Sequence, residues 1–138
     1  MSHFILDHDN RARLAAALER GDWVIACLCA AWCDSCRQYQ PDFAALAQRH
    51  PDKCLVWIDI EDQADLVGDI EVENFPTLLI QRADTVAFFG SVTPDARVAD
   101  RLIAAQAEKS AAELAAQAGA DDHQDCNLRR LLAAADGA

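Results

Sequence analysis

Continuous apolar runs alternate along this chain with stretches whose apolar residues recur at helical spacing. The runs at 23–31 and 54–60 have the composition of strands that are buried on both faces. Residues 10–20 place their leucines on one helical face and stop at Gly21, which predicts an amphipathic helix. A second helical stretch follows the first apolar run and extends to about His50.

The second half of the pattern predicts a hairpin between helices. Short apolar strands at 77–81 and 86–90 flank a polar turn, and residues 61–70 form a short helix or turn. A further helix should start at Thr93, whose hydroxyl is followed by a proline and an acid. This order predicts an α/β protein with a central mixed sheet flanked by helices, in which the hairpin closes a parallel sheet.

The composition changes near residue 104. The following segment is rich in alanine and helical in character but has little bulk to bury, and a polar linker then precedes a short last helix at 127–136. We therefore expect one domain at 1–104 and an alanine-rich helical C-terminal extension at 105–138.

Bulk properties narrow the class of protein. With 138 residues, 52% of them apolar, the chain can build one substantial core. A net charge of −11 argues against nucleic acid or an anionic membrane as partner and leaves protein partners open. The N-terminus has no basic leader and no apolar signal segment, so we expect a cytoplasmic protein. Abundant alanine and arginine suggest a bacterial source.

Two of the six cysteines, Cys33 and Cys36, lie three positions apart in the stretch AAWCDSCRQYQP. If a buried strand ends and a helix begins here, Cys33 occupies the helix N-terminus, where unpaired amides and the helix dipole stabilise a thiolate by ~0.3–1 kcal/mol. Cys36, one turn later, lies within disulfide reach. Such a pair can act as a redox couple, in which one cysteine attacks a disulfide and the other resolves the product.

Three motifs together resemble the thioredoxin family. They are Trp32-Cys33-Asp34-Ser35-Cys36, Pro41 after the second cysteine, and Phe75-Pro76-Thr77 before the hairpin. The resemblance spans about residues 10–104 and implies a thioredoxin-like fold. It also implies that a cis peptide bond precedes Pro76, and that this proline faces the redox pair across a peptide-binding groove. The groove positions implied are Trp32, Asp34, Ser35, Phe75 and Pro76.

The chain departs from the family pattern between the two cysteines. The usual Gly-Pro is replaced by Asp34-Ser35. The carboxylate of Asp34 should disfavour a neighbouring thiolate, and Arg37 could offset it. Because family members span reduction potentials of about −270 to −120 mV, the direction of electron flow stays open.

The buried acid that the family keeps on the strand before the motif is also missing. Cys27 occupies its position, and Trp57 occupies that of its lysine partner. This change should slow proton transfer to or from the resolving cysteine. Asp59 is a candidate substitute, although a solvated acid at a strand end is the simpler interpretation. Cys29 replaces a second groove tryptophan.

The remaining cysteines have simpler interpretations. Cys27 and Cys29 read as small buried residues on one strand face, and Cys54 as packing. A rival hypothesis has Cys27, Cys29, Cys33 and Cys36 ligating zinc or an iron–sulfur cluster, but two of them would have to leave an apolar strand. Cys126 lies in a polar linker and could be an exposed thiol.

The sequence thus predicts a thiol–disulfide oxidoreductase that acts on protein disulfides, with Cys33 as nucleophile and Cys36 as resolving cysteine. It needs no metal or organic cofactor, takes electrons from an unidentified reductase, and should be slow without the buried acid. The alternative is a non-catalytic thioredoxin-fold module for protein interaction, chaperoning or assembly. The oligomeric state stays open.

Overall fold

A five-stranded mixed sheet forms the centre of the computed structural model. The structure describes residues 3–68, 70, 72, 74–83, 85–93, 95–109, 112–113 and 126–136. In spatial order the strands are β1 (His3–Ile5), β3 (Cys54–Asp59), β2 (Trp23–Cys29), β4 (Thr77–Arg82) and β5 (Thr85–Ser91). The first three run parallel, and β4 and β5 add the antiparallel hairpin. The predicted α/β class and mixed sheet are therefore confirmed.

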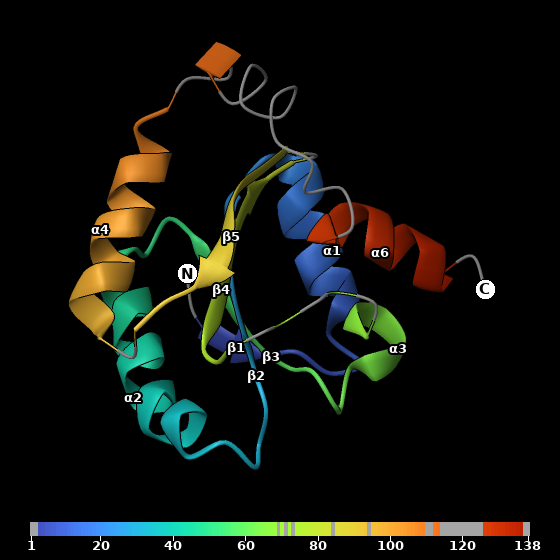
Figure 1. The fold of residues 1–138 in the computed structure, drawn as a ribbon. Coiled ribbons are helices and arrows are strands. Elements are labelled where there is room, and N and C mark those ends of the chain that lie inside the picture. The colour runs from blue at the N-terminus through green and yellow to red at the C-terminus, as the bar shows by residue number, and fades with distance from the viewer. Residues whose placement is uncertain are drawn as a thin grey trace.

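Helices cover both faces of the sheet (Figure 1). Two of them, α2 (Asp34–Arg49) and α4 (Ala96–Ala107), lie on one face. The other face is covered by α1 (Arg11–Arg20), α3 (Ala64–Val67) and α6 (Leu128–Asp136). None of the helices in the described part of the chain is long and apolar enough to cross a membrane.

The central strand β2 explains why the apolar run is continuous. Its side chains alternate between two core clusters, and all of those from Val24 to Cys29 are fully buried. Ala26 and Leu28 face α1, α3 and α6, whereas Cys27 and Cys29 face α2 and α4. Burial on both faces requires an apolar residue at every position, so the period-two alternation of a one-sided strand is absent.

Some boundaries differ from the prediction. The strand β1 was not predicted, because a three-residue edge strand is too short to show a pattern. The cap of α4 is Asp95 rather than Thr93, since the Asp95 carboxylate accepts a hydrogen bond from the Arg97 amide at 2.9 Å. The alanine-rich segment beyond α4 and the predicted linker lie mostly outside the described residues.

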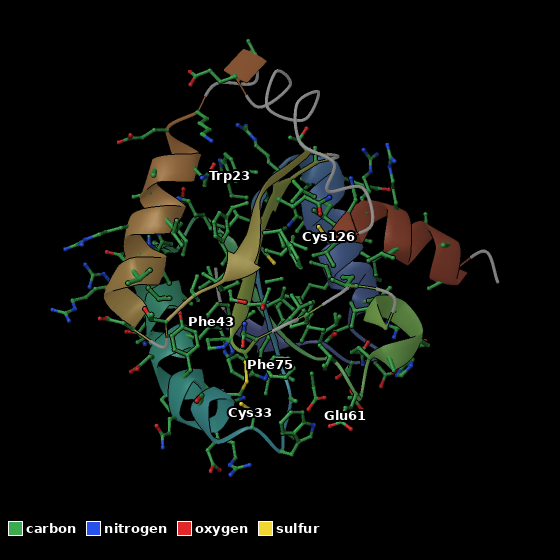
Figure 2. The ribbon with its side chains drawn as sticks, in the orientation of Figure 1. Trp23, Cys33, Phe43, Glu61, Phe75 and Cys126 are labelled. Carbon is green, nitrogen blue, oxygen red and sulfur yellow. A yellow bond between two sulfur atoms is a disulfide. The ribbon has the colours of Figure 1, made fainter. Side chains whose placement is uncertain are left out.

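The last helix packs into the main core. Leu128 is fully buried and Leu132 nearly so, and both belong to the cluster formed with α1 and α3. Cys126 is buried as well, only 3% exposed, so the expectation of a surface thiol is wrong. Figure 2 shows it beside α1 and α6. The polar residues around it do not reveal this burial, because the apolar partners are distant in the sequence.

A buried amide connects α6 to the sheet. Gln81, fully buried on β4, accepts a hydrogen bond from the Leu128 amide at 2.8 Å and donates one to the Asn127 side chain at 2.9 Å. The Asn127 oxygen in turn accepts from the Arg129 amide at 3.1 Å, which caps the helix. The start of α6 is therefore fixed by side-chain hydrogen bonds as well as by apolar packing.

We predict that Gln81→Met lowers the free energy of unfolding by about 1–3 kcal/mol, because it leaves the buried Leu128 amide without an acceptor. Urea denaturation would measure the change. The matched control is Gln38→Met, which makes the same replacement at an exposed position of α2 and should have little effect. Equal stability of the two variants would contradict the prediction.

Candidate redox site

The site begins where β2 ends and α2 starts. Cys33 is the N-cap residue of α2, with an extended backbone at φ −86° and ψ 119°. Its carbonyl accepts the first helical hydrogen bond, from the Arg37 amide at 3.1 Å, and its own amide donates to the Ala30 carbonyl at 3.1 Å. The Cys33 thiol is free and partly exposed. The predicted position of Cys33 at the helix start is confirmed.

Cys36 has a different partner from the one expected. Its sulfur forms a disulfide with Cys29, the last residue of β2, across a Cα–Cα distance of 5.7 Å. Both residues are buried, with Cys29 fully covered and Cys36 1% exposed. In this state the expected Cys33–Cys36 bond is absent. The interpretation of Cys29 as a residue of packing alone is wrong.

The local geometry explains this pairing. Cys29 projects onto the α2 side of the sheet, and the first turn of α2 packs over the end of the same strand. A residue three positions into that turn faces inward, toward the strand, whereas the N-cap residue lies at the rim. Cys36 is therefore directed at Cys29 while Cys33 stays accessible.

The two residues between the motif cysteines lie at the surface. Asp34 and Ser35 are exposed, and Asp34 pairs with the Arg37 guanidinium. Arg37 also donates to the Ala31 carbonyl at 2.7 Å, which holds the guanidinium over the loop. The sequence predicted that Arg37 could offset the charge of Asp34, and the two side chains are in direct contact. Because both groups are largely exposed, the pair contributes little to stability.

An aromatic rim lies beside Cys33. Trp32 is 64% exposed, a high value for an indole, and its ring meets Phe75 edge-on at 5.6 Å between centroids. The Phe75–Pro76 peptide bond is cis. Cys33 and Phe75 pack against the same core cluster, and Figure 2 shows them at the same end of the molecule. A free thiol, two aromatic rings and a cis peptide unit therefore share one edge.

A cavity of about 280 Å³ borders Cys36. It is lined by Ile5, Ala30, Ala31, Cys36, Arg37, Gln40, Trp57 and Asp59. Asp59 ends β3 directly opposite Cys29 in the sheet register, and its carboxylate accepts hydrogen bonds from the Glu61 and Asp62 amides at 2.9 and 3.2 Å. The Asp59 carboxylate and the buried Cys36 thus border one cavity.

Cys27 precedes Cys29 by two residues on the same face of β2. It is fully buried, lies 3.8 Å from the Cys29 sulfur, and pairs in register with Trp57. Burial raises the pKa of the Cys27 thiol far above its ordinary value, which favours its protonated form at neutral pH. Cys27 and Trp57, which occupy the positions of the implied acid and lysine, are therefore packed together as an apolar pair.

The metal hypothesis does not fit the described site. Two of its four cysteines, Cys29 and Cys36, are joined to each other, and a disulfide sulfur is not a thiolate ligand. Among the residues that the structure describes, no group of three or more His, Cys, Asp or Glu side chains is arranged to hold a metal ion.

Sequence reasoning missed the disulfide partner of Cys36, which is Cys29. A signal was present, because a strand ending just before the helix places alternate residues on the helix side. Cys27 and Cys29 both satisfy that alternation, and only the residue nearer the strand end can meet the first turn of α2.

Comparisons with known proteins identify the family to which the chain belongs. The thioredoxin family model matches residues 7–107. A protein of Streptomyces coelicolor named "Putative thioredoxin 2" is 31% identical over 106 residues, which cover 71% of this chain and 78% of that protein. A thioredoxin H-type of Brassica campestris is 28% identical over 82 residues, and the match spans 59% of this chain and 65% of the relative.

Solved structures share the fold at low identity. A poplar thioredoxin h superposes with a TM-score of 0.69 at 20% identity, covering 80% of this chain and all of that structure. A mutant thioredoxin of Halobacterium salinarum gives a TM-score of 0.65 at 21% identity, covering 79% and 94% of the two chains. The family model covers well over half of the sequence, and the expected thioredoxin-like fold is confirmed, so this chain belongs to the thioredoxin family.

Proposed function

We propose that the protein is a thiol–disulfide oxidoreductase that acts on protein disulfides, with Cys33 as nucleophile and Cys36 as resolving cysteine. The observation that carries the proposal is the free, partly exposed Cys33 thiol at the N-terminus of a sixteen-residue helix. The amides of the first turn and the helix dipole favour the thiolate there. Membership of a family of thiol–disulfide oxidoreductases supports the same reaction class.

The catalytic cycle follows from the positions of the two sulfurs. The Cys33 thiolate attacks a substrate disulfide, forms a mixed disulfide and releases one substrate thiolate. Cys36, one helical turn along, then attacks the Cys33 sulfur and releases the second. The Cys29–Cys36 bond must be open for this step, so the state seen here precedes reduction by a donor. No step requires a metal or an organic cofactor.

The substrate groove in this proposal is the aromatic rim. Trp32 and Phe75 offer apolar surface to an extended peptide, and the backbone at Pro76 lies beside them. Asp34 and Ser35 border the same edge from the helix side. With a net charge of −11, the protein favours substrates and a reductase that present basic surfaces. The expected cytoplasmic, reducing setting would supply that reductase.

Asp59 is the proposed proton acceptor for the resolving cysteine. It borders the cavity that also reaches Cys36, whereas the family's usual acid position holds the protonated Cys27. A carboxylate across a small cavity can relay a proton through one water molecule. The longer path predicts slower resolution than a directly placed acid would give.

Cys33→Ser should abolish catalysed reduction of insulin by dithiothreitol, a loss of more than roughly tenfold, because the hydroxyl is not ionised at neutral pH. Cys36→Ser should instead accumulate a mixed disulfide with the substrate, visible by non-reducing electrophoresis and mass spectrometry. Cys54→Ala, which removes a thiol at the far end of β3, is the control and should turn over normally.

The non-catalytic alternative makes the opposite prediction. For an interaction or chaperone module, the wild-type protein would not accelerate insulin reduction, and the Cys33→Ser variant would bind its partners unchanged. That pair of results would reject the oxidoreductase proposal.

Asp59→Asn should slow resolution of the mixed disulfide roughly tenfold at pH 7. The defect should shrink as the pH rises, because hydroxide then removes the thiol proton without help from the carboxylate. The asparagine oxygen can still accept from Glu61 and Asp62, so the turn is retained. Stopped-flow tryptophan fluorescence over a pH series measures the rate. Glu61→Gln makes the same charge change two residues away, and a defect of equal size in that variant would contradict the assigned role.

A further inference from the structure

The site of this chain brings together one more cysteine than a dithiol mechanism uses. Cys29 is joined to Cys36, both residues are buried, and Cys33 remains a free thiol at the rim. In this state the disulfide is buried, whereas the Cys33 thiol stays accessible. A simple two-cysteine cycle would instead consume the nucleophile in its oxidised form.

We propose that Cys29 is a third catalytic cysteine, which takes the disulfide over from Cys33 and stores it as the buried Cys29–Cys36 bond. This inference rests on the proposed function, because a substrate disulfide supplies the oxidising equivalents. It names a further residue of the same site and an oxidised state in which Cys33 is regenerated.

The exchange is balanced in atoms and electrons. After resolution, Cys33 and Cys36 share a disulfide and Cys29 is a thiol. The Cys29 thiolate attacks the Cys36 sulfur, the Cys29–Cys36 bond forms, the Cys33–Cys36 bond breaks, and Cys33 leaves as a thiolate. The proton released by Cys29 passes toward the cavity at Asp59. Overall, the thiols of Cys29 and Cys36 give two electrons to the substrate disulfide.

The surroundings favour Cys29 over its neighbour for this step. Cys29 ends β2 next to the loop, and its register partner is Asp59, which borders the cavity shared with Cys36. Cys27 precedes Cys29 by two residues on the strand, and its register partner is Trp57 rather than a carboxylate. Although the two sulfurs are 3.8 Å apart, only Cys29 has a carboxylate opposite it in the sheet.

Two consequences follow for the oxidised protein. Cys33 can still attack a second disulfide, but Cys36 is occupied and cannot release that partner, so the mixed disulfide persists. Reduction by a donor must also pass through Cys33, which attacks Cys36 and returns the bond to the rim, because the stored disulfide itself is buried. The buried bond therefore acts as a protected oxidised form.

Disulfide mapping of the wild-type protein tests the stored state without any substitution. The protein is oxidised with one equivalent of insulin, alkylated with iodoacetamide while native, quenched in acid and cleaved before aspartate. Cleavage before Asp34 separates Cys36 from the other motif cysteines and yields the peptides 22–33 and 34–41. We expect these peptides to be linked through Cys29, with close to one alkyl group per chain on Cys33. A Cys33–Cys36 linkage as the main product overturns the proposal.

Two variants test the order of the exchange. In Cys29→Ala the oxidised form should be Cys33–Cys36, and alkylation of Cys33 should fall to near zero. In the control Cys27→Ala, which shortens a thiol on the same strand face, linkage and alkylation should match the wild type. In Cys33→Ser, insulin should form the Cys29–Cys36 bond more than roughly tenfold more slowly, because the entry thiol is missing. Equal rates in Cys33→Ser and wild type overturn the relay.

The outcomes separate this inference from the proposed function. Insulin reduction that depends on Cys33, together with a Cys33–Cys36 linkage, rejects the third cysteine and leaves the oxidoreductase proposal intact. If the protein does not reduce insulin at all, the proposed function fails. Oxidation by diamide then still reports whether Cys29 or Cys33 is the partner of Cys36.

Discussion

The junction between β2 and α2 is the constraint on which the rest of this structure depends. A strand buried on both faces has to end where a helix begins, and the first turn of that helix packs over the strand end. Three sulfurs are placed by this one junction. The N-cap position holds Cys33 at the rim, beside amides without helical partners, while the inward face of the turn brings Cys36 to Cys29. A free, partly exposed thiol and a buried disulfide are thus placed by neighbouring positions on one helix.

The sheet keeps the junction rigid because both of its faces are covered. α2 and α4 enclose the side that carries the cysteines, and α1, α3 and α6 enclose the other. α6 is part of this enclosure, since Leu128 is fully buried and Gln81 fixes the helix start by hydrogen bonds. Because β2 is buried on both faces, it carries no charged residue between Val24 and Cys29. Cys27 occupies the acid position, and the carboxylate that borders the cavity at Cys36 is that of Asp59, at the end of β3.

Much of the fold was predictable from local patterns. The apolar runs indicated β2 and β3, the hairpin followed from its polar turn, and the N-cap position of Cys33 followed from the change from strand to helix. The misses share a cause, which is that they depend on contacts distant in the sequence or on elements too short to show a period. β1 has three residues, and Cys126 is buried in one cluster with residues of α1, which lie more than a hundred positions away.

The sequence by itself determined the fold class, the position of Cys33 at a helix start and the family, because burial pattern, helix start and motif spacing are written in consecutive residues. Only the tertiary structure decided which sulfur Cys36 meets. Spacing along the chain allowed both Cys33 and Cys29, and the choice depends on how the first turn of α2 lies against the end of β2. That angle is set by packing of the whole helix on the sheet, through residues such as Phe43 and Leu46, rather than by the motif.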